Sequence, residues 1–108
     1  MRQVLQRYRT AYEGLDARSA RAVWPAVNEN ALARAFDGLS AQTLNFDVCY
    51  ITLNSPGEAG ATCRGSASYI PKVGNREPHI EARTWTFTLR RTGPDWKIES
   101  ARTAAGRQ

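Results

Sequence analysis

The chain has 108 residues, of which 42% are hydrophobic and 23% are charged. These values predict one globular domain over residues 1–108, and they exclude a disordered tail, a collagen-like repeat and a coiled coil. The net charge is +5, but the basic residues are scattered along the chain and form no continuous basic arm. We therefore expect no nucleic-acid partner. No apolar run approaches the roughly 18 residues that a membrane span requires, so we expect no span in this chain.

The first part of the sequence predicts three helices. Residues 2–15 place apolar side chains at the spacing of an amphipathic helix. Asp16 is a good N-cap for a short second helix, which Pro25 ends. Asn28 or Asn30 can cap a third helix that carries its own apolar stripe.

After Ser40 the hydrophobic period changes to two, which is typical of strands. The predicted strands cover residues 43–53, 59–70, 79–91 and 96–102. Three helices followed by four antiparallel strands predict an α+β domain. We expect its ordered core to cover about residues 2–103, followed by a frayed tail.

Hairpin geometry predicts which strand residues share a face. Turns near residues 56, 74–75 and 92–93 give the opposite pairs Cys49–Cys63, Gly65–Trp85 and Phe87–Ile98. The predicted core face carries Cys49, Ile51, Leu53, Ala61, Cys63, Gly65, Trp85, Phe87, Leu89, Trp96 and Ile98. The predicted outer face carries Thr62, Arg64, Ser66, Ser68, Thr84, Thr86, Thr88, Arg90, Lys97 and Glu99.

Cys49 and Cys63 are the two cysteines of the chain. Directly opposed cysteines on antiparallel strands can have close Cβ atoms. We predict a disulfide between them and hence an extracytoplasmic location, in the bacterial periplasm. The alternative is a pair of reduced core thiols in a cytoplasmic protein.

Three apolar residues interrupt the polar outer face. Phe46, Val48 and Tyr50 are predicted to point away from the side of Cys49 and Ile51. They fit either a self-association patch or ordinary isolated exposure of apolar side chains.

A set of short motifs gives the chain a family resemblance. They are Tyr8-Arg9-Thr10-Ala11-Tyr12, Val23-Trp24-Pro25, Leu32-Ala33-Arg34-Ala35-Phe36, Cys49-Tyr50-Ile51, Ala61-Thr62-Cys63, Tyr69-Ile70-Pro71-Lys72 and Trp96-Lys97-Ile98. With the order of elements, they resemble the nuclear transport factor 2-like (SnoaL-like) superfamily over roughly Val4 to Arg102. Within this superfamily, the chain is most similar to small bacterial domains that are either extracytoplasmic or appended to sensor and kinase proteins.

The resemblance implies a cystatin-like cone, in which three N-terminal helices pack on a curved four-stranded antiparallel sheet. It also implies a homodimer, because such cones often pair through the outer face of the sheet. It implies little about activity, since the superfamily includes isomerases, dehydratases, cyclases and transport factors.

Enzymes of this superfamily place acid and base groups inside the cone. If this chain is an enzyme, the candidate residues are Glu81, Arg83, Tyr12 and His79, and Asp47 lies on the side of Cys49. The favoured interpretation is that Glu81 and Arg83 are paired or solvated and that His79 belongs to a loop. We therefore do not expect an enzyme.

Aromatic residues from separate elements are expected to meet inside the cone. They are Tyr8, Tyr12, Trp24, Phe36 and Trp85. Such a set fits a ligand pocket or a filled core. One histidine and two cysteines offer no recognisable metal site, and we expect no metal or cofactor.

The leading functional hypothesis is a non-catalytic module for ligand binding, sensing or assembly, with a small apolar molecule as the ligand. One alternative is an isomerase-, dehydratase- or cyclase-like acid–base enzyme that acts on a small apolar substrate. Another is a plain dimerisation domain.

Overall fold

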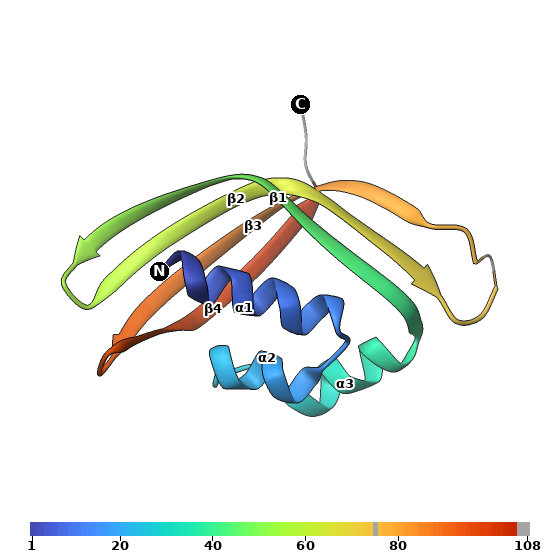
Figure 1. The fold of residues 1–108 in the computed structure, drawn as a ribbon, viewed down its shortest axis with the longest axis horizontal. Coiled ribbons are helices and arrows are strands. Elements are labelled where there is room, and N and C mark those ends of the chain that lie inside the picture. Colours follow the sequence, from blue (N-terminus) through green and yellow to red (C-terminus); the bar gives the residue numbers. More distant parts are fainter. Residues whose placement is uncertain (75, 106–108) are drawn as a thin grey trace.

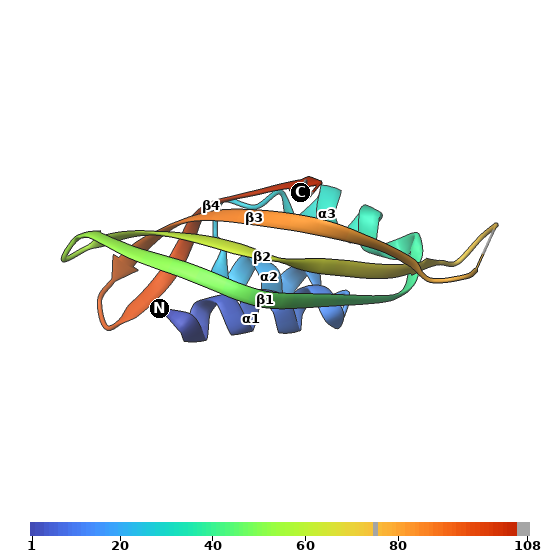
Figure 2. The same cartoon turned by 90° about the horizontal axis from the view of Figure 1, so that it is seen from above.

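The computed structural model describes residues 1–74 and 76–105, and it shows three helices on one face of a four-stranded antiparallel sheet (Figure 1). The elements are α1 (Arg2–Glu13), α2 (Ala17–Val23), α3 (Glu29–Asp37), β1 (Leu39–Ser55), β2 (Glu58–Pro71), β3 (His79–Thr92) and β4 (Asp95–Ala105). The strands lie in the order β1-β2-β3-β4, and the sheet curves over the helices (Figures 1 and 2). The predicted α+β cone is confirmed.

Side-chain caps explain where the short helices begin. The Asp16 carboxylate accepts hydrogen bonds from the backbone N–H of Ser19 at 3.1 Å and from its hydroxyl at 2.7 Å. The side-chain oxygen of Asn28 accepts from the N–H of Ala31 at 3.0 Å, so Asn28 and not Asn30 is the cap of α3. Each cap satisfies an amide that the first helical turn leaves without a partner.

The strands are longer than the sequence pattern predicts. β4 continues to Ala105 because β3 offers partners along its length, and Arg83 pairs with Ala105. Residues 104–105 were expected in the frayed tail, whereas the structure places them in β4. The end of that tail, residues 106–108, lies outside the described residues.

A β-bulge at Asp47 changes which side of β1 faces the helices. Phe46 pairs with Gly65 and Val48 pairs with Arg64, so Asp47 is the extra residue between them. Phe46 therefore packs against the core, with its ring 4.8 Å from that of Trp85. The prediction that Phe46 lies on the outer face with Val48 and Tyr50 was wrong, because the bulge reverses the alternation at this point.

Gly65 lets β1 and β2 approach closely at the bulge. A Cβ at this position would lie 1.7 Å from the backbone oxygen of Asn45. The predicted pairing of Gly65 with Trp85 was wrong: Gly65 pairs with Arg83, and Trp85 pairs with Cys63. A shift of two residues leaves every side chain of β3 on its predicted face.

The last hairpin also differs from the predicted pairing. Ile98 lies opposite Leu89 and Phe87 lies opposite Ala101, because the register shifts between Thr88 and Leu89. Lys97 was expected on the outer face. Its Nζ instead donates a hydrogen bond to the carbonyl of Ala22 at 3.0 Å, at the end of α2.

The hydrophobic core lies between the concave face of the sheet and the helices. Its most completely buried side chains are Trp85, Phe87, Leu89, Ile98 and Cys63. Leu53 was expected in this face but is 56% exposed, because it lies near the tip of the β1–β2 hairpin.

The disulfide predicted from strand pairing is present. Cys49 and Cys63 are directly opposite each other on β1 and β2, and their sulfur atoms are 2.09 Å apart. The bridge therefore fixes the two strands close to the bulge. Within residues 1–74 and 76–105, no helix is long and apolar enough to cross a membrane.

Candidate functional site

A cavity of about 200 Å³ lies between the concave face of the sheet and the helices. Its lining residues are Tyr8, Tyr12, Trp24, Gln42, Leu44, Arg83, Trp85, Ala101 and Thr103. They come from α1, the end of α2 and three of the four strands. The cavity is thus inside the cone, where the sequence places its candidate pocket.

Four of the five predicted pocket residues line this cavity. Tyr8 and Tyr12 lie one helical turn apart on α1, and their rings stack at 4.3 Å. Trp24 caps α2, and Trp85 projects from β3. Phe36 does not line the cavity but supports it from behind, with its ring edge-on to Tyr12 at 5.2 Å.

Two hydrogen bonds tie the end of α1 to β1 and so position the aromatic wall. The side-chain amide of Gln42 donates to the carbonyl of Tyr12 at 2.9 Å. The N–H of Leu44 donates to the carboxylate of Glu13 at 3.0 Å. Because both bonds are partly buried, they hold the end of the helix against the strand.

Both tyrosines of the cavity are neutral at neutral pH, and burial strengthens their preference for the neutral form by raising the pKa of each. It raises the pKa of Tyr8 far above the usual value, and the nearby Tyr12 raises it further, whereas Arg83 acts in the opposite direction. Burial also raises the pKa of Tyr12, although its hydrogen bond with Tyr8 partly opposes this. Neutral phenols can donate hydrogen bonds to a ligand but are poor bases at neutral pH.

Arg83 is the charged residue in the cavity lining. It is half-buried on β3, and its guanidinium forms an ion pair with Glu81. Arg83 therefore adds a cation, with its carboxylate partner beside it, to a wall that combines four aromatic side chains with the polar side chains of Gln42 and Thr103.

The residues proposed for acid–base catalysis are only partly brought together. Tyr12 and Arg83 line the cavity, and Glu81 is held next to Arg83. His79 is the first residue of β3, outside the cavity lining, and its exposed ring stacks on Tyr69 at 5.2 Å. The arrangement offers hydrogen-bond donors from Tyr12 and Arg83 and holds the carboxylate of Glu81 beside Arg83.

Asp47 does not point into the cone. It is exposed at the bulge, and its carboxylate accepts a hydrogen bond from the side-chain amide of Asn45 at 2.8 Å. In the described part of the chain, no group of three or more His, Cys, Asp or Glu side chains is placed to hold a metal ion.

Sequence reasoning missed Gln42, Leu44, Ala101 and Thr103 as parts of the cavity wall. The first two reach it because the bulge makes the even-numbered residues before Asp47 face inward. The last two reach it because β4 is longer than expected. Gly65, a glycine inside the second predicted strand, is the sequence signal that could have located the bulge, because such glycines often mark bulges or close backbone approaches.

Among known proteins, the chain is similar to solved structures of one superfamily. No family model and no curated protein sequence matches the chain. Among solved structures, a nuclear transport factor 2-like superfamily protein from Salmonella enterica has a TM-score of 0.85 at 12% identity, over 98% of this chain and 88% of that one.

Two further solved structures are similar. A proposed dehydratase of the same family from Streptomyces avermitilis has a TM-score of 0.82 at 13% identity, over 98% of this chain and 94% of that one. A type 2 hexachlorocyclohexane dehydrochlorinase has a TM-score of 0.80 at 6% identity, over 98% of this chain and 82% of that one. At such low identities, a shared fold does not imply a shared function. The chain therefore has the fold of the nuclear transport factor 2-like superfamily, as its sequence motifs indicate.

Proposed function

We propose that this domain is a non-catalytic module that binds a small, largely apolar molecule inside the cone. The observation that carries the proposal is the cavity of about 200 Å³ walled by Tyr8, Tyr12, Trp24 and Trp85. A cavity of about 150 Å³ can hold benzene, so a cavity of about 200 Å³ has room for a single ring. The ligand is therefore a single-ring molecule, and an acceptor on it would face the tyrosine hydroxyls and Arg83.

Binding can be followed through the tryptophans of the cavity. We expect benzoate to change the intrinsic fluorescence in a saturable way, because Trp24 and Trp85 form part of the wall. Ala101→Leu should abolish this change, since the larger side chain fills the space that the ligand needs. The matched control is Ala104→Leu on the same strand, at an exposed position outside the cavity lining. Equal binding by both variants would contradict the proposed site.

We also propose that the domain forms a homodimer through the outer face of the sheet. Val48 is 39% exposed and Tyr50 is 62% exposed on this face. The charge of Arg90 could oppose burial on this face, but Arg90 is paired with Glu99. Its Nη2 atom also lies 3.9 Å from Oε2 of Glu58. Pairing would remove the apolar side chains from water without leaving Arg90 uncompensated.

Replacing Val48 and Tyr50 together tests the dimer. We expect the Val48→Arg/Tyr50→Glu variant to be a folded monomer by sedimentation, because it places charges in the proposed interface. The control is Leu53→Glu/Val73→Arg, which changes two exposed apolar residues of the hairpin tip and the β2–β3 loop. A wild-type protein that sediments as a monomer at high concentration would contradict the proposal.

We propose an extracytoplasmic, periplasmic location, which the Cys49–Cys63 disulfide supports. Protein that is unfolded without reductant should show no reactive thiols, and two should appear after reduction. The bridge closes a short loop, with a separation of 14 residues. Replacing both cysteines with Ala should therefore cost about 2–3 kcal/mol of unfolding free energy. Two reactive thiols in the unreduced protein isolated from the periplasm would contradict this proposal.

A further inference from the structure

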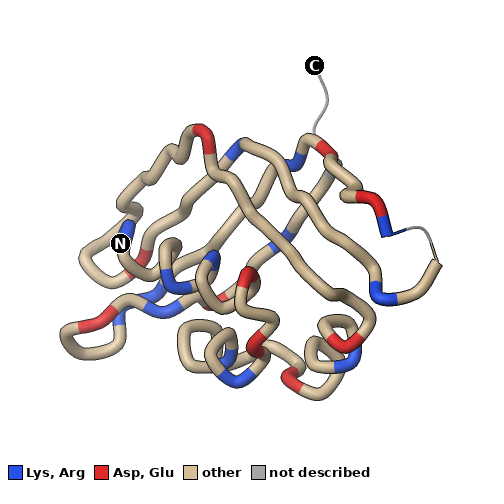
Figure 3. The backbone as a smooth tube through the Cα atoms, turned by 45° about the vertical axis from the view of Figure 1, so that its right-hand side comes forward, with Lys and Arg blue, Asp and Glu red and all other residues tan. Residues whose placement is uncertain are grey.

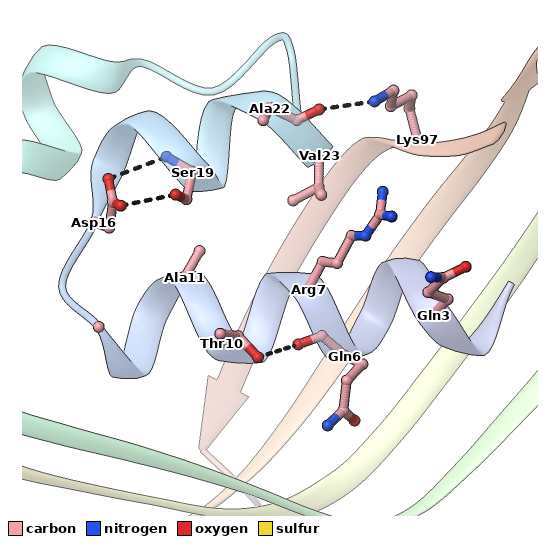
Figure 4. A pocket seen from close by; sticks show the side chains of 11 residues that line it. Gln3, Gln6, Arg7, Thr10, Ala11, Asp16, Ser19, Ala22, Val23 and Lys97 are labelled. Carbon is pink, nitrogen blue, oxygen red and sulfur yellow. Dashed lines mark hydrogen bonds between the residues drawn. The ribbon is translucent and has the colours of Figure 1, made fainter.

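A second and larger hollow lies on the other side of α1, outside the cone. This cleft has a volume of about 710 Å³ and lies between α1, α2 and β4 (Figure 4). Its lining residues are Gln3, Gln6, Arg7, Thr10, Ala11, Gly14, Asp16, Ser19, Ala22, Val23 and Lys97. It shares no residue with the lining of the interior cavity.

The helix α1 presents a polar stripe to this cleft. Gln3, Gln6, Arg7 and Thr10 follow one another at the spacing of a helical face. The Thr10 hydroxyl donates to the carbonyl of Gln6 at 3.0 Å. Within residues 1–74 and 76–105, the side-chain amide of Gln3 has no hydrogen-bond partner in the protein, so it can bind a ligand, whereas the amide of Gln6 points away from α2 and Lys97 (Figure 4).

Two cations enter the cleft from opposite walls. Figure 4 shows Arg7 extending from α1 across the cleft in the direction of Lys97 on β4. Lys97 uses one donor for the carbonyl of Ala22 and keeps its others. Among the described residues, Arg7 forms no ion pair.

The one carboxylate of the lining does not neutralise these cations by contact. Both oxygens of Asp16 are bound to Ser19, and these hydrogen bonds lower the pKa of Asp16. The carboxylate of Asp16 thus acts as the N-cap at the start of α2. Elsewhere in the molecule acidic and basic residues are interspersed along the chain (Figure 3). The cleft therefore has two cations, Arg7 and Lys97, in its lining together with hydrogen-bonding side chains.

We propose that the cleft binds a small molecule with at least two acidic oxygen groups, carboxylates or phosphates. The guanidinium of Arg7 suits a bidentate contact with one group, and the ammonium of Lys97 can contact the other. The amide of Gln3 can bind a further polar group of the ligand. The volume lies within the range of small-molecule pockets, and the site is independent of the ligand proposed for the cone.

Titrations with citrate and with pyrophosphate test the proposal, with binding read from backbone amide NMR signals. We expect saturable shifts at residues of α1 and of the α2 end of the cleft. Arg7→Gln should weaken binding by about tenfold or more, the loss typical of a charge-assisted contact. The matched control is Arg34→Gln, which removes the same charge from an exposed position on α3 outside the cleft.

The control decides between a site and general attraction to a basic protein. The proposal is supported if Arg7→Gln weakens the affinity for the probe while Arg34→Gln changes it by less than about twofold. Equal weakening by the two variants, or no saturable shift with either probe, would overturn the proposal. An oligoglutamate peptide that binds through Arg7 when citrate and pyrophosphate do not would also overturn it, in favour of an acidic protein partner.

Discussion

Trp85→Ala should lower the free energy of unfolding by about 3–5 kcal/mol, the loss typical of removing a large buried ring. Trp85 is 1% exposed, contacts the ring of Phe46 and forms part of the cavity wall. The truncation would remove the contacts of the ring and join the space it occupies to an existing cavity. Urea denaturation followed by circular dichroism measures the loss.

Trp96→Ala is the matched control. Trp96 is only partly buried on β4 and does not line the interior cavity. Its truncation should cost clearly less than that of Trp85. A loss below about 1 kcal/mol for Trp85→Ala would show that this ring is not packed as described.

Gly65→Ala should cost about 3 kcal/mol or more, although it adds only one methyl group. The added Cβ would lie 1.7 Å from the backbone oxygen of Asn45, and a backbone atom in a paired strand has little freedom to move. The strands would have to separate at the bulge, close to the Cys49–Cys63 bridge. The unfolding midpoint in urea reports the effect.

Gly60→Ala on the same strand is the control for Gly65→Ala. A Cβ at Gly60 would have its closest neighbour at 3.9 Å, which is an ordinary contact. Gly60→Ala should therefore change stability by less than about 1 kcal/mol. If the two substitutions have the same effect, the close approach of β1 to Gly65 is not present in solution.

The fold could be predicted because its strongest signals are local. The apolar spacing of the helices, the caps at Asp16 and Asn28, and the change to a period of two at β1 agree with one another. The pairing of Cys49 with Cys63 followed from the position of one short turn.

The errors arose where one extra residue changes a strand's alternation. The bulge at Asp47 moves Phe46 into the core and leaves Val48 and Tyr50 outside. A strict period of two contains no information about such an insertion. The register shift after Thr88 altered the pairing of Ile98 in the same way.

The candidate site was predictable in its aromatic part only. Tyr8, Tyr12, Trp24 and Trp85 are large residues on apolar faces, so composition and spacing point to them. Polar residues of the wall depend on tertiary structure. Gln42 faces inward through the bulge, and Thr103 does so through the length of β4.

The cleft beside α1 had no sequence signal. Its cations come from residues far apart in the chain, Arg7 on α1 and Lys97 on β4. The alternation of β4 predicted that Lys97 faces outward, whereas its amine reaches the end of α2. Only the packing of α1 and α2 against β4 brings the two cations to one hollow.

The central claim is that a small ligand binds inside the cone, and intermolecular nuclear Overhauser effects test it most directly. Leu44 and Ala101 are methyl-bearing residues of the interior cavity, whereas Ala22 and Thr10 have methyl groups in the lining of the outer cleft. We expect the ring protons of bound benzoate to show effects to the methyl groups of Leu44 and Ala101. Saturable binding with effects only to Ala22 or Thr10, or no binding at all, would contradict the claim.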